Sequence, residues 1–110
     1  MEIKIKEWRN EVEKRGHIKY IEFRCPVCGN TQSIKDFLDI GVDKDKIEGV
    51  FYFSCIGRFT GAKSMSEKPC NYTSGGLFML NKLLVIDDDN KKIPVFDFAE
   101  NPINKESANV

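Results

Sequence analysis

The spacing of four cysteines constrains the fold of this chain more than any other feature of its sequence. In chain order they are Cys25, Cys28, Cys55 and Cys70. The first two form a C-x2-C turn, in which two thiolates can bind the same tetrahedral ion while the amides of the turn point at the sulfurs. Pro26 suits this turn because its φ is preset, and Gly29 suits it because glycine can leave the turn with a positive φ.

Two thiolates fill only half of the coordination sphere of a tetrahedral metal ion. We therefore expect Cys55 and Cys70 to supply the remaining ligands, so that each chain binds one Zn²⁺. A polar loop of 14 residues separates this second pair, whereas a regular zinc ribbon closes with another C-x2-C turn. A structural zinc site is nevertheless the interpretation that gives all four cysteines a role.

Redox chemistry is the main alternative, because Cys-Pro-Val-Cys also resembles the active pair of a glutaredoxin. A thiol-disulfide redox protein would need a helix that begins at Cys25 and lowers the pKa of its thiol. The segment Gly29-Asn30-Thr31 would end such a helix at once, and two cysteines would be left without a role. Disulfides and free buried thiols are further alternatives.

The length and charge of the chain limit its architecture and partners. With 110 residues it can form one small zinc-stabilised domain, which we place at residues 1–99, followed by a loosely ordered tail at 100–110. Basic and acidic residues both number 17, so no overall field draws the chain to nucleic acid or to a membrane. Because neither a signal-peptide run nor about 18 consecutive apolar residues occur, we expect a cytoplasmic protein with reduced thiols and no membrane partner.

Local patterns predict an α+β fold. We expect a small zinc-ribbon-like domain of antiparallel strands, with an N-terminal helix and one short helix after the first cysteine pair. Apolar residues three and four positions apart predict the first helix over residues 6–15, with Gly16 as its stop. Ser33 is expected to cap the short helix, which ends at Gly41. A further helical turn is expected at 42–48, and strands are expected at 18–23, 50–54, 83–86 and 93–98.

The expected core draws its apolar residues from all of these elements. Trp8 is the only tryptophan, and we expect it to anchor the buried face of the first helix. The expected core residues are Trp8, Val12, Phe23, Phe37, Leu38, Phe51, Phe53, Leu84, Ile86, Val95 and Phe96. His17 follows the helix stop, and with four cysteines available we expect a loop residue rather than a ligand or a base.

Four sequence blocks, in order along the chain, resemble one family. They are Phe23–Ser33 (FRCPVCGNTQS), Phe53–Gly61 (FSCIGRFTG), Cys70–Phe78 (CNYTSGGLF) and Pro94–Phe98 (PVFDF). Together they resemble a family of small uncharacterised bacteriophage and prophage proteins, and the resemblance covers nearly the whole chain. It implies a phage context in the cytoplasm of a bacterial host cell, where small accessory proteins often bind host components. It implies no particular mechanism.

Positive charge is concentrated in the second half of the chain, where residues 54–82 contain four basic side chains and one acidic one. A zinc-stabilised scaffold could present the 56–68 loop to an anionic ligand such as a nucleotide or nucleic acid. The expected ligand-binding residues are Arg58, Phe59, Thr60, Lys63, Ser64, Lys68, Tyr72 and Thr73. Two simpler interpretations stay open. Arg24, Arg58 and Lys68 could balance a dianionic four-thiolate centre, and the loop could be a neutral insertion.

Two other classes of function compete with an anion-binding module. A protein-interaction module, for example an inhibitor of a host enzyme or defence complex, could use an aromatic patch such as Tyr52, Phe59 and Tyr72. An enzyme is not expected, because four thiolates leave a zinc ion no open position and no Ser/His/Asp set or carboxylate pair stands out. The sequence does not determine the oligomeric state.

Overall fold

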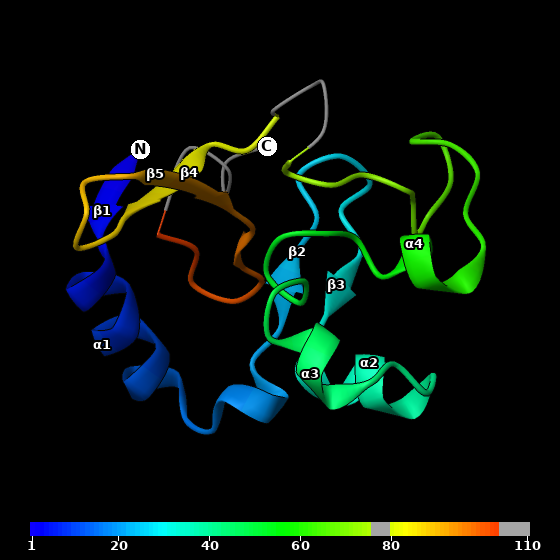
Figure 1. Cartoon of the computed structure of the whole chain (residues 1–110), viewed down its shortest axis with the longest axis horizontal. Helices are drawn as coiled ribbons and strands as arrows, with labels where there is room; N and C mark the ends of the chain where they lie inside the picture. The colour runs from blue at the N-terminus through cyan, green and yellow to red at the C-terminus, as the bar shows by residue number, and fades with distance from the viewer. Residues whose placement is uncertain (76–79, 104–110) are drawn as a thin grey trace.

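Figure 1 shows the computed structural model of the chain, which describes residues 1–75 and 80–103. The N-terminal strand β1 (Glu2–Lys4) pairs in parallel with β4 (Leu83–Ile86). Strand β5 (Lys92–Val95) pairs with the other edge of β4 in the antiparallel direction. These three strands form the first sheet, in the order β1-β4-β5.

The second sheet has the order β3-β2-β6 and consists of two-residue strands. Its strands are β2 (Phe23–Arg24), β3 (Thr31–Gln32) and β6 (Asp97–Phe98), and both pairings are antiparallel. The turn that carries the first cysteine pair joins β2 to β3. Only Phe96 separates β5 from β6, so the chain passes directly from the first sheet into the second, and Phe96 N donates to Tyr52 O at 2.7 Å.

Short helices lie around the two sheets. The longest, α1 (Ile5–Arg15), ends at Gly16, whose φ is 109°. The others are η1 (Ile18–Tyr20, a 3₁₀ helix), α2 (Ile34–Asp39), α3 (Lys44–Ile47) and α4 (Gly57–Thr60). Ser33 caps α2 in a capping box with Asp36, as expected. The predicted α+β fold is confirmed. None of the helices in the described ranges is long and apolar enough to cross a membrane.

Two of the expected strands are wrong. The first half of the segment 18–23 forms η1, and only its last residue belongs to β2. Residues 50–53 form successive turns, in which Ser54 N donates to Val50 O at 2.9 Å, and Ser54 alone makes an isolated bridge. Both segments are rich in β-branched and aromatic residues. That composition favours a half-buried surface, but local hydrogen bonds satisfy the amides where no strand edge is available.

Within residues 1–75 and 80–103 the core consists of two clusters, and Trp8, Tyr52 and Ile103 pack against both. The buried residues of the larger, the cysteine cluster, are Ile21, Phe23, Cys25, Phe37, Ile47, Phe51, Cys55, Ile56, Cys70, Tyr72, Phe96 and Phe98. The buried residues of the smaller, the sheet cluster, are Ile3, Leu83, Val85 and Val95. Ile3 belongs to β1, a strand that the sequence did not predict. The strand forms because β4 offers an edge, where Ile3 pairs with Val85.

The expected core is confirmed in large part. Phe23, Phe37, Phe51, Val95 and Phe96 are buried, and Trp8, Val12 and Phe53 are half-buried. The prediction that Leu38 is a core residue is wrong, because Leu38 lies on the outer side of α2 and is 38% exposed. The prediction that Leu84 and Ile86 are buried is wrong by one position, because β4 turns Leu83 and Val85 into the core instead. A shift of one residue exchanges the two faces of a strand.

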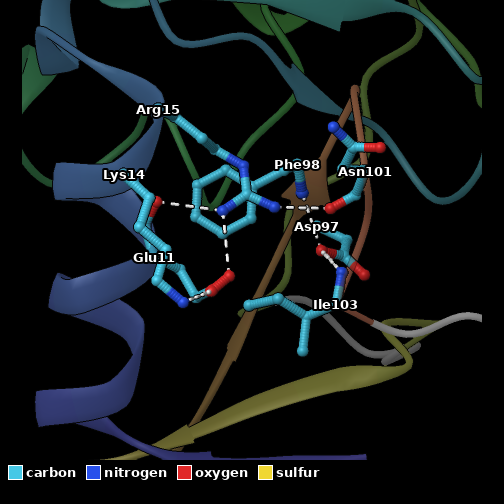
Figure 2. A network of polar contacts seen from close by, with 7 residues as sticks. All are labelled: Glu11, Lys14, Arg15, Asp97, Phe98, Asn101 and Ile103. Atoms are coloured by element: carbon cyan, nitrogen blue, oxygen red, sulfur yellow. Dashed lines mark hydrogen bonds and ion pairs between the residues drawn. The ribbon is translucent and has the colours of Figure 1, made fainter.

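The last described residues pack against the end of α1 (Figure 2). The guanidinium of Arg15 lies 3.9 Å from the centroid of the Phe98 ring and donates a hydrogen bond to Asn101 O. A stacked cation of this kind fixes the path of the chain after β6. Of the tail expected at 100–110, residues 104–110 lie outside the described residues.

Candidate metal centre

The four cysteine sulfurs converge on one point. All four Sγ atoms lie within 4.8 Å of one another, and the pairs Cys25–Cys70 and Cys28–Cys55 are 3.7 and 3.8 Å apart. A tetrahedral ion about 2.3 Å from each of four sulfurs would place the sulfurs about 3.8 Å from one another. A disulfide would instead bring two sulfurs to about 2.05 Å. The spacing therefore fits four ligands of one metal ion, and the cysteines are not paired in disulfides.

Cys25 and Cys28, here called the first half-site, lie in the turn between β2 and β3. Cys25 N donates to Asn30 O at 2.9 Å, and Gly29 N donates to Cys25 O at 3.0 Å. Gly29 has a φ of 76°, so glycine serves the predicted purpose of leaving the turn. The amides of Val27 and Cys28 donate to the Cys25 sulfur, and Asn30 N donates to the Cys28 sulfur at 3.4 Å.

Cys55 and Cys70, the second half-site, come from two segments that meet side by side. Ser54 and Thr73 form a bridge whose hydroxyl oxygens are 2.8 Å apart, and Cys55 N donates to Tyr72 O at 2.9 Å. Tyr72 N donates to the Cys70 sulfur at 3.4 Å.

The same backbone hydrogen bond recurs at every cysteine. Each sulfur accepts an amide from the residue two positions later, and the four donors are Val27, Asn30, Gly57 and Tyr72. Amide donors stabilise the thiolate form of cysteine, which is the form that binds a metal. The backbone is therefore arranged for four thiolates, even though the second half-site lacks the C-x2-C pattern.

Gly57 allows the two segments of the second half-site to approach. A Cβ atom at this position would lie 2.1 Å from Cys70 O and 2.7 Å from the carbonyl carbon of Pro69. No side chain fits in that space, so the residue must be glycine. The sequence signal was present, since Gly57 follows Cys55 by two residues, but glycine in a polar loop is usually a sign of a turn rather than of backbone contact.

Four thiolates this close together repel one another unless a cation compensates their charge. A hydrogen bond from the Cys25 thiol lowers the pKa of Cys55. The same hydrogen bond, together with burial, raises the pKa of Cys25, and burial raises the pKa of Cys70. Only part of the cluster can ionise by itself, whereas a bound metal ion replaces the protons and compensates the charge.

The two arginines expected near the centre have matching positions. Arg24 donates through Nη1 to Gly29 O at 2.8 Å, and Arg58 donates through Nη1 to Asn71 O at 2.9 Å. Each arginine thus binds a carbonyl of one half-site, while its side chain remains exposed. Both positions suit a cation beside a dianionic centre.

The remaining residues expected to bind a ligand divide into two groups. Lys63 and Lys68 are exposed, the Phe59 ring is 39% exposed, and the hydroxyls of Thr60 and Ser64 bond within the loop. Tyr72 is buried, and its hydroxyl donates to Asn81 Oδ1 at 2.6 Å while accepting from Leu80 N at 2.7 Å. The Thr73 hydroxyl bonds to Ser54. Tyr72 and Thr73 therefore direct their hydroxyls to partners within the protein, whereas Lys63, Lys68 and part of the Phe59 ring face solvent.

A family model described as VVA0879-like matches residues 4–99, a range that holds all four cysteines and every element from α1 to β6. The chain belongs to the VVA0879-like family. Neither the curated proteins nor the solved structures include a significant match. The matched range covers all four cysteines, the whole second sheet and strands β4 and β5 of the first, so the four cysteines are part of the family's domain rather than an appended segment.

Proposed function

We propose that this protein is a non-enzymatic binding module held together by one Zn²⁺ ion, which Cys25, Cys28, Cys55 and Cys70 bind. The observation that carries this proposal is the set of four converging sulfurs, three of which belong to buried residues. Soft thiolate ligands in a tetrahedron select zinc or iron, and zinc with four cysteines is a common structural centre. Four protein ligands leave no coordination position for a substrate or a water, so the centre supports structure rather than catalysis.

The metal has a direct test in the protein as purified without added metal. Elemental analysis is expected to find one zinc per chain and no iron. A coloured protein that contains iron would contradict the choice of zinc but retain a metal centre. A folded protein with neither metal would overturn the proposal, because the binding free energy of a structural metal is also folding free energy.

The ligand, we propose, is an anionic nucleotide or nucleic acid bound in the host cytoplasm by the loop of residues 56–68. Arg58, Lys63 and Lys68 carry this proposal, since within the described part of the chain none of the three forms an ion pair. Glu67, the acid of the loop, is already engaged. Its carboxylate accepts the amides of Lys63 and Ser64 at 2.5 and 2.8 Å and thereby shapes the loop without neutralising the cations.

Phe59 adds an aromatic surface to these cations. Its ring packs edge-on against the buried ring of Phe37, with centroids 5.5 Å apart and planes at 78°. A ring held in this way loses little freedom when a base stacks on its outer face. Cations beside a fixed aromatic ring are the combination that proteins use to bind single-stranded nucleic acid without sequence preference.

Salt dependence tests the proposed ligand. A labelled single-stranded DNA oligonucleotide is titrated with the zinc-loaded protein at several salt concentrations. Three phosphate contacts predict a slope of about −2 for log affinity against log salt. Arg58→Gln is expected to reduce the magnitude of that slope by about 0.7. Arg24→Gln is the matched control, because Arg24 has the same kind of bond at the other half-site and should leave the slope unchanged.

A protein partner, such as a host enzyme or defence complex, is the second candidate function. The observation in its favour is the exposure of two apolar side chains on the same loop, Phe59 at 39% and Met65 at 41%. Apolar contacts depend little on salt. A protein that binds no oligonucleotide or ATP at low salt, but captures one host protein through a contact that Phe59→Ser abolishes, would favour this candidate.

A further inference from the structure

Gln32 is a fully buried polar residue whose side-chain hydrogen bonds all go to the segment that carries Cys55. Its side chain is 0% exposed and lies in β3. Nε2 donates to Phe51 O and to Ser54 O, each at 2.8 Å, and Oε1 accepts from Ile56 N at 2.7 Å. The amide thus uses both N–H donors and an oxygen lone pair, and all three partners are backbone groups.

Two of these three contacts flank one metal ligand, Cys55. Ser54 and Ile56 are the neighbours of Cys55, so the Gln32 amide holds the chain immediately before and after that cysteine. On the other side, the backbone of Gln32 pairs with Phe23, two residues before Cys25. One side chain therefore connects the hairpin of the first half-site to the segment that carries the second.

The connection has no equivalent elsewhere in the described residues. Apart from the contacts between cysteine sulfurs, Gln32 makes the only side-chain hydrogen bonds there that join the first half-site hairpin to the segments of the second. Other bonds near Cys55, such as that from Cys55 N to Tyr72 O, stay within the second half-site. The packing of Phe23 against Phe51 also holds these segments together, but Gln32 supplies the directional contacts beside Cys55 itself.

We infer that Gln32 is a positioning residue for the metal, which sets the second half-site at the distance from the first that a tetrahedral ion requires. The inference rests on the proposed metal function. We call the three side-chain hydrogen bonds of Gln32 the brace. Without the brace, the ion must hold Cys55 in place by its own bonds, so metal affinity falls and metal release becomes faster. Partners that orient metal ligands typically contribute about 10–100-fold to affinity.

The test compares three variants with the wild-type chain. Gln32→Met keeps the shape and removes all three hydrogen bonds. Gln32→Glu keeps the acceptor for Ile56 N and places a carboxylate against two carbonyls. Val85→Ala is the matched control, because Val85 is buried in the sheet cluster and its truncation lowers stability without contact to either half-site. The measurements are Co²⁺ affinity by competition with a chelator, the visible bands that report tetrahedral Co²⁺, and the rate of Zn²⁺ release.

Gln32→Met is expected to weaken Co²⁺ binding by about 10–100-fold, to alter the visible bands and to speed release. Val85→Ala is expected to leave the visible bands unchanged and to lower the affinity only as far as its loss of stability accounts for. Gln32→Glu should be affected at least as strongly. A Gln32→Met protein with the wild-type spectrum, whose affinity falls no further than its loss of stability accounts for, would overturn the inference, because the Gln32 hydrogen bonds would then serve folding alone. A wild-type chain that binds no metal would overturn the proposed function as well, so the two failures are distinguishable.

A measurement on the wild-type chain keeps the inference testable if the variants do not fold. In the zinc-loaded protein, the amide of Ile56, which Gln32 holds, is expected to exchange its hydrogen as slowly as the amide of Cys55, which Tyr72 holds. Fast exchange at Ile56 alone would show that the brace is open and would overturn the positioning role.

Discussion

Two parts of the molecule bury their side chains by different routes. The sheet half lies around the sheet β1-β4-β5, and the cysteine half lies around the four cysteines and the sheet β3-β2-β6. In the first sheet, β4 pairs with strands on both edges, and its residues alternate between the core and the outer face. Among the described residues, the cysteine half buries twelve residues against four in the sheet cluster. Its strands nevertheless have two residues each, and its helices have three to six.

This difference shows what replaces regular secondary structure in a small domain. Two-residue strands cannot hold a cluster by their own hydrogen bonds, so the cysteine half depends on specific contacts at Gln32, at Gly57 and between the sulfurs. In the sheet half, the stabilisation is spread over the backbone hydrogen bonds that join β4 to β1 and β5. Single substitutions should therefore lower the free energy of unfolding more in the cysteine half than in the sheet half.

Cys25→Ser is expected to have the largest effect. A structural zinc contributes about 10–16 kcal/mol in small zinc domains, which is as much as the whole stability of a typical protein. The variant should lose zinc and cooperative unfolding, as measured by elemental analysis and thermal melting. Removal of the metal from the wild-type chain with a chelator should produce the same melt. A metal-free variant with the wild-type melting curve would show that the cysteine half is stable by itself.

Phe37→Ala should lower the free energy of unfolding by about 3–5 kcal/mol, since the ring is fully buried in the cysteine cluster. Chemical denaturation measures the change. Leu38→Ala is the control on the same helix. Because Leu38 is 38% exposed, its truncation should cost less than about 1 kcal/mol. Equal losses at the two positions would mean that α2 faces the core differently.

Gly57→Ala should cost about 1–3 kcal/mol or more, because the new Cβ would overlap Cys70 O and push the second half-site apart. It should also speed zinc release. Gly49→Ala is the matched control, since nothing lies within 4 Å of the position of its Cβ. Unchanged zinc release in Gly57→Ala would show that the two segments can separate without loss of metal geometry.

Arg15→Met should cost about 1 kcal/mol through loss of the stacked cation on Phe98 (Figure 2). The Arg15 hydrogen bond also lowers the pKa of the Glu11 carboxyl. That part of the stabilisation is therefore present above the usual pKa of glutamate and is lost as the pH falls through the lowered value. Lys14→Met, at a side chain 73% exposed, should change little. Denaturation at neutral and acidic pH measures both effects.

Arg58→Ala has the smallest expected effect on folding and a selective effect on binding. Its hydrogen bond to Asn71 O is exposed, so zinc content and melting temperature should stay nearly unchanged. Binding of the oligonucleotide should weaken by at least about 1 kcal/mol. If stability falls and binding is retained, the arginine supports the second half-site instead, and the ligand binds elsewhere.

The sequence predicted the cysteine half better in its chemistry than in its backbone. Ligand identity depends on residue type and local spacing, so the first half-site, its Gly29 exit and the Ser33 cap of α2 were all predictable. The strands expected at 18–23 and 50–54 were not formed, because a run of β-branched and aromatic residues indicates burial without naming a partner edge. The bridge from Ser54 to Thr73 joins residues 19 positions apart, and no local pattern specifies it.

By itself, the sequence determined the α+β class, the cysteine set and most of the large buried side chains, since residue type and local periodicity decide these. The tertiary structure alone decided which face of β4 is buried, that β1 pairs with β4, and that Tyr72 is buried. It also gave Gln32 and Gly57 their importance. Glutamine and glycine are common in exposed turns, and only long-range contact turns one into a buried brace and the other into the point where two backbones touch.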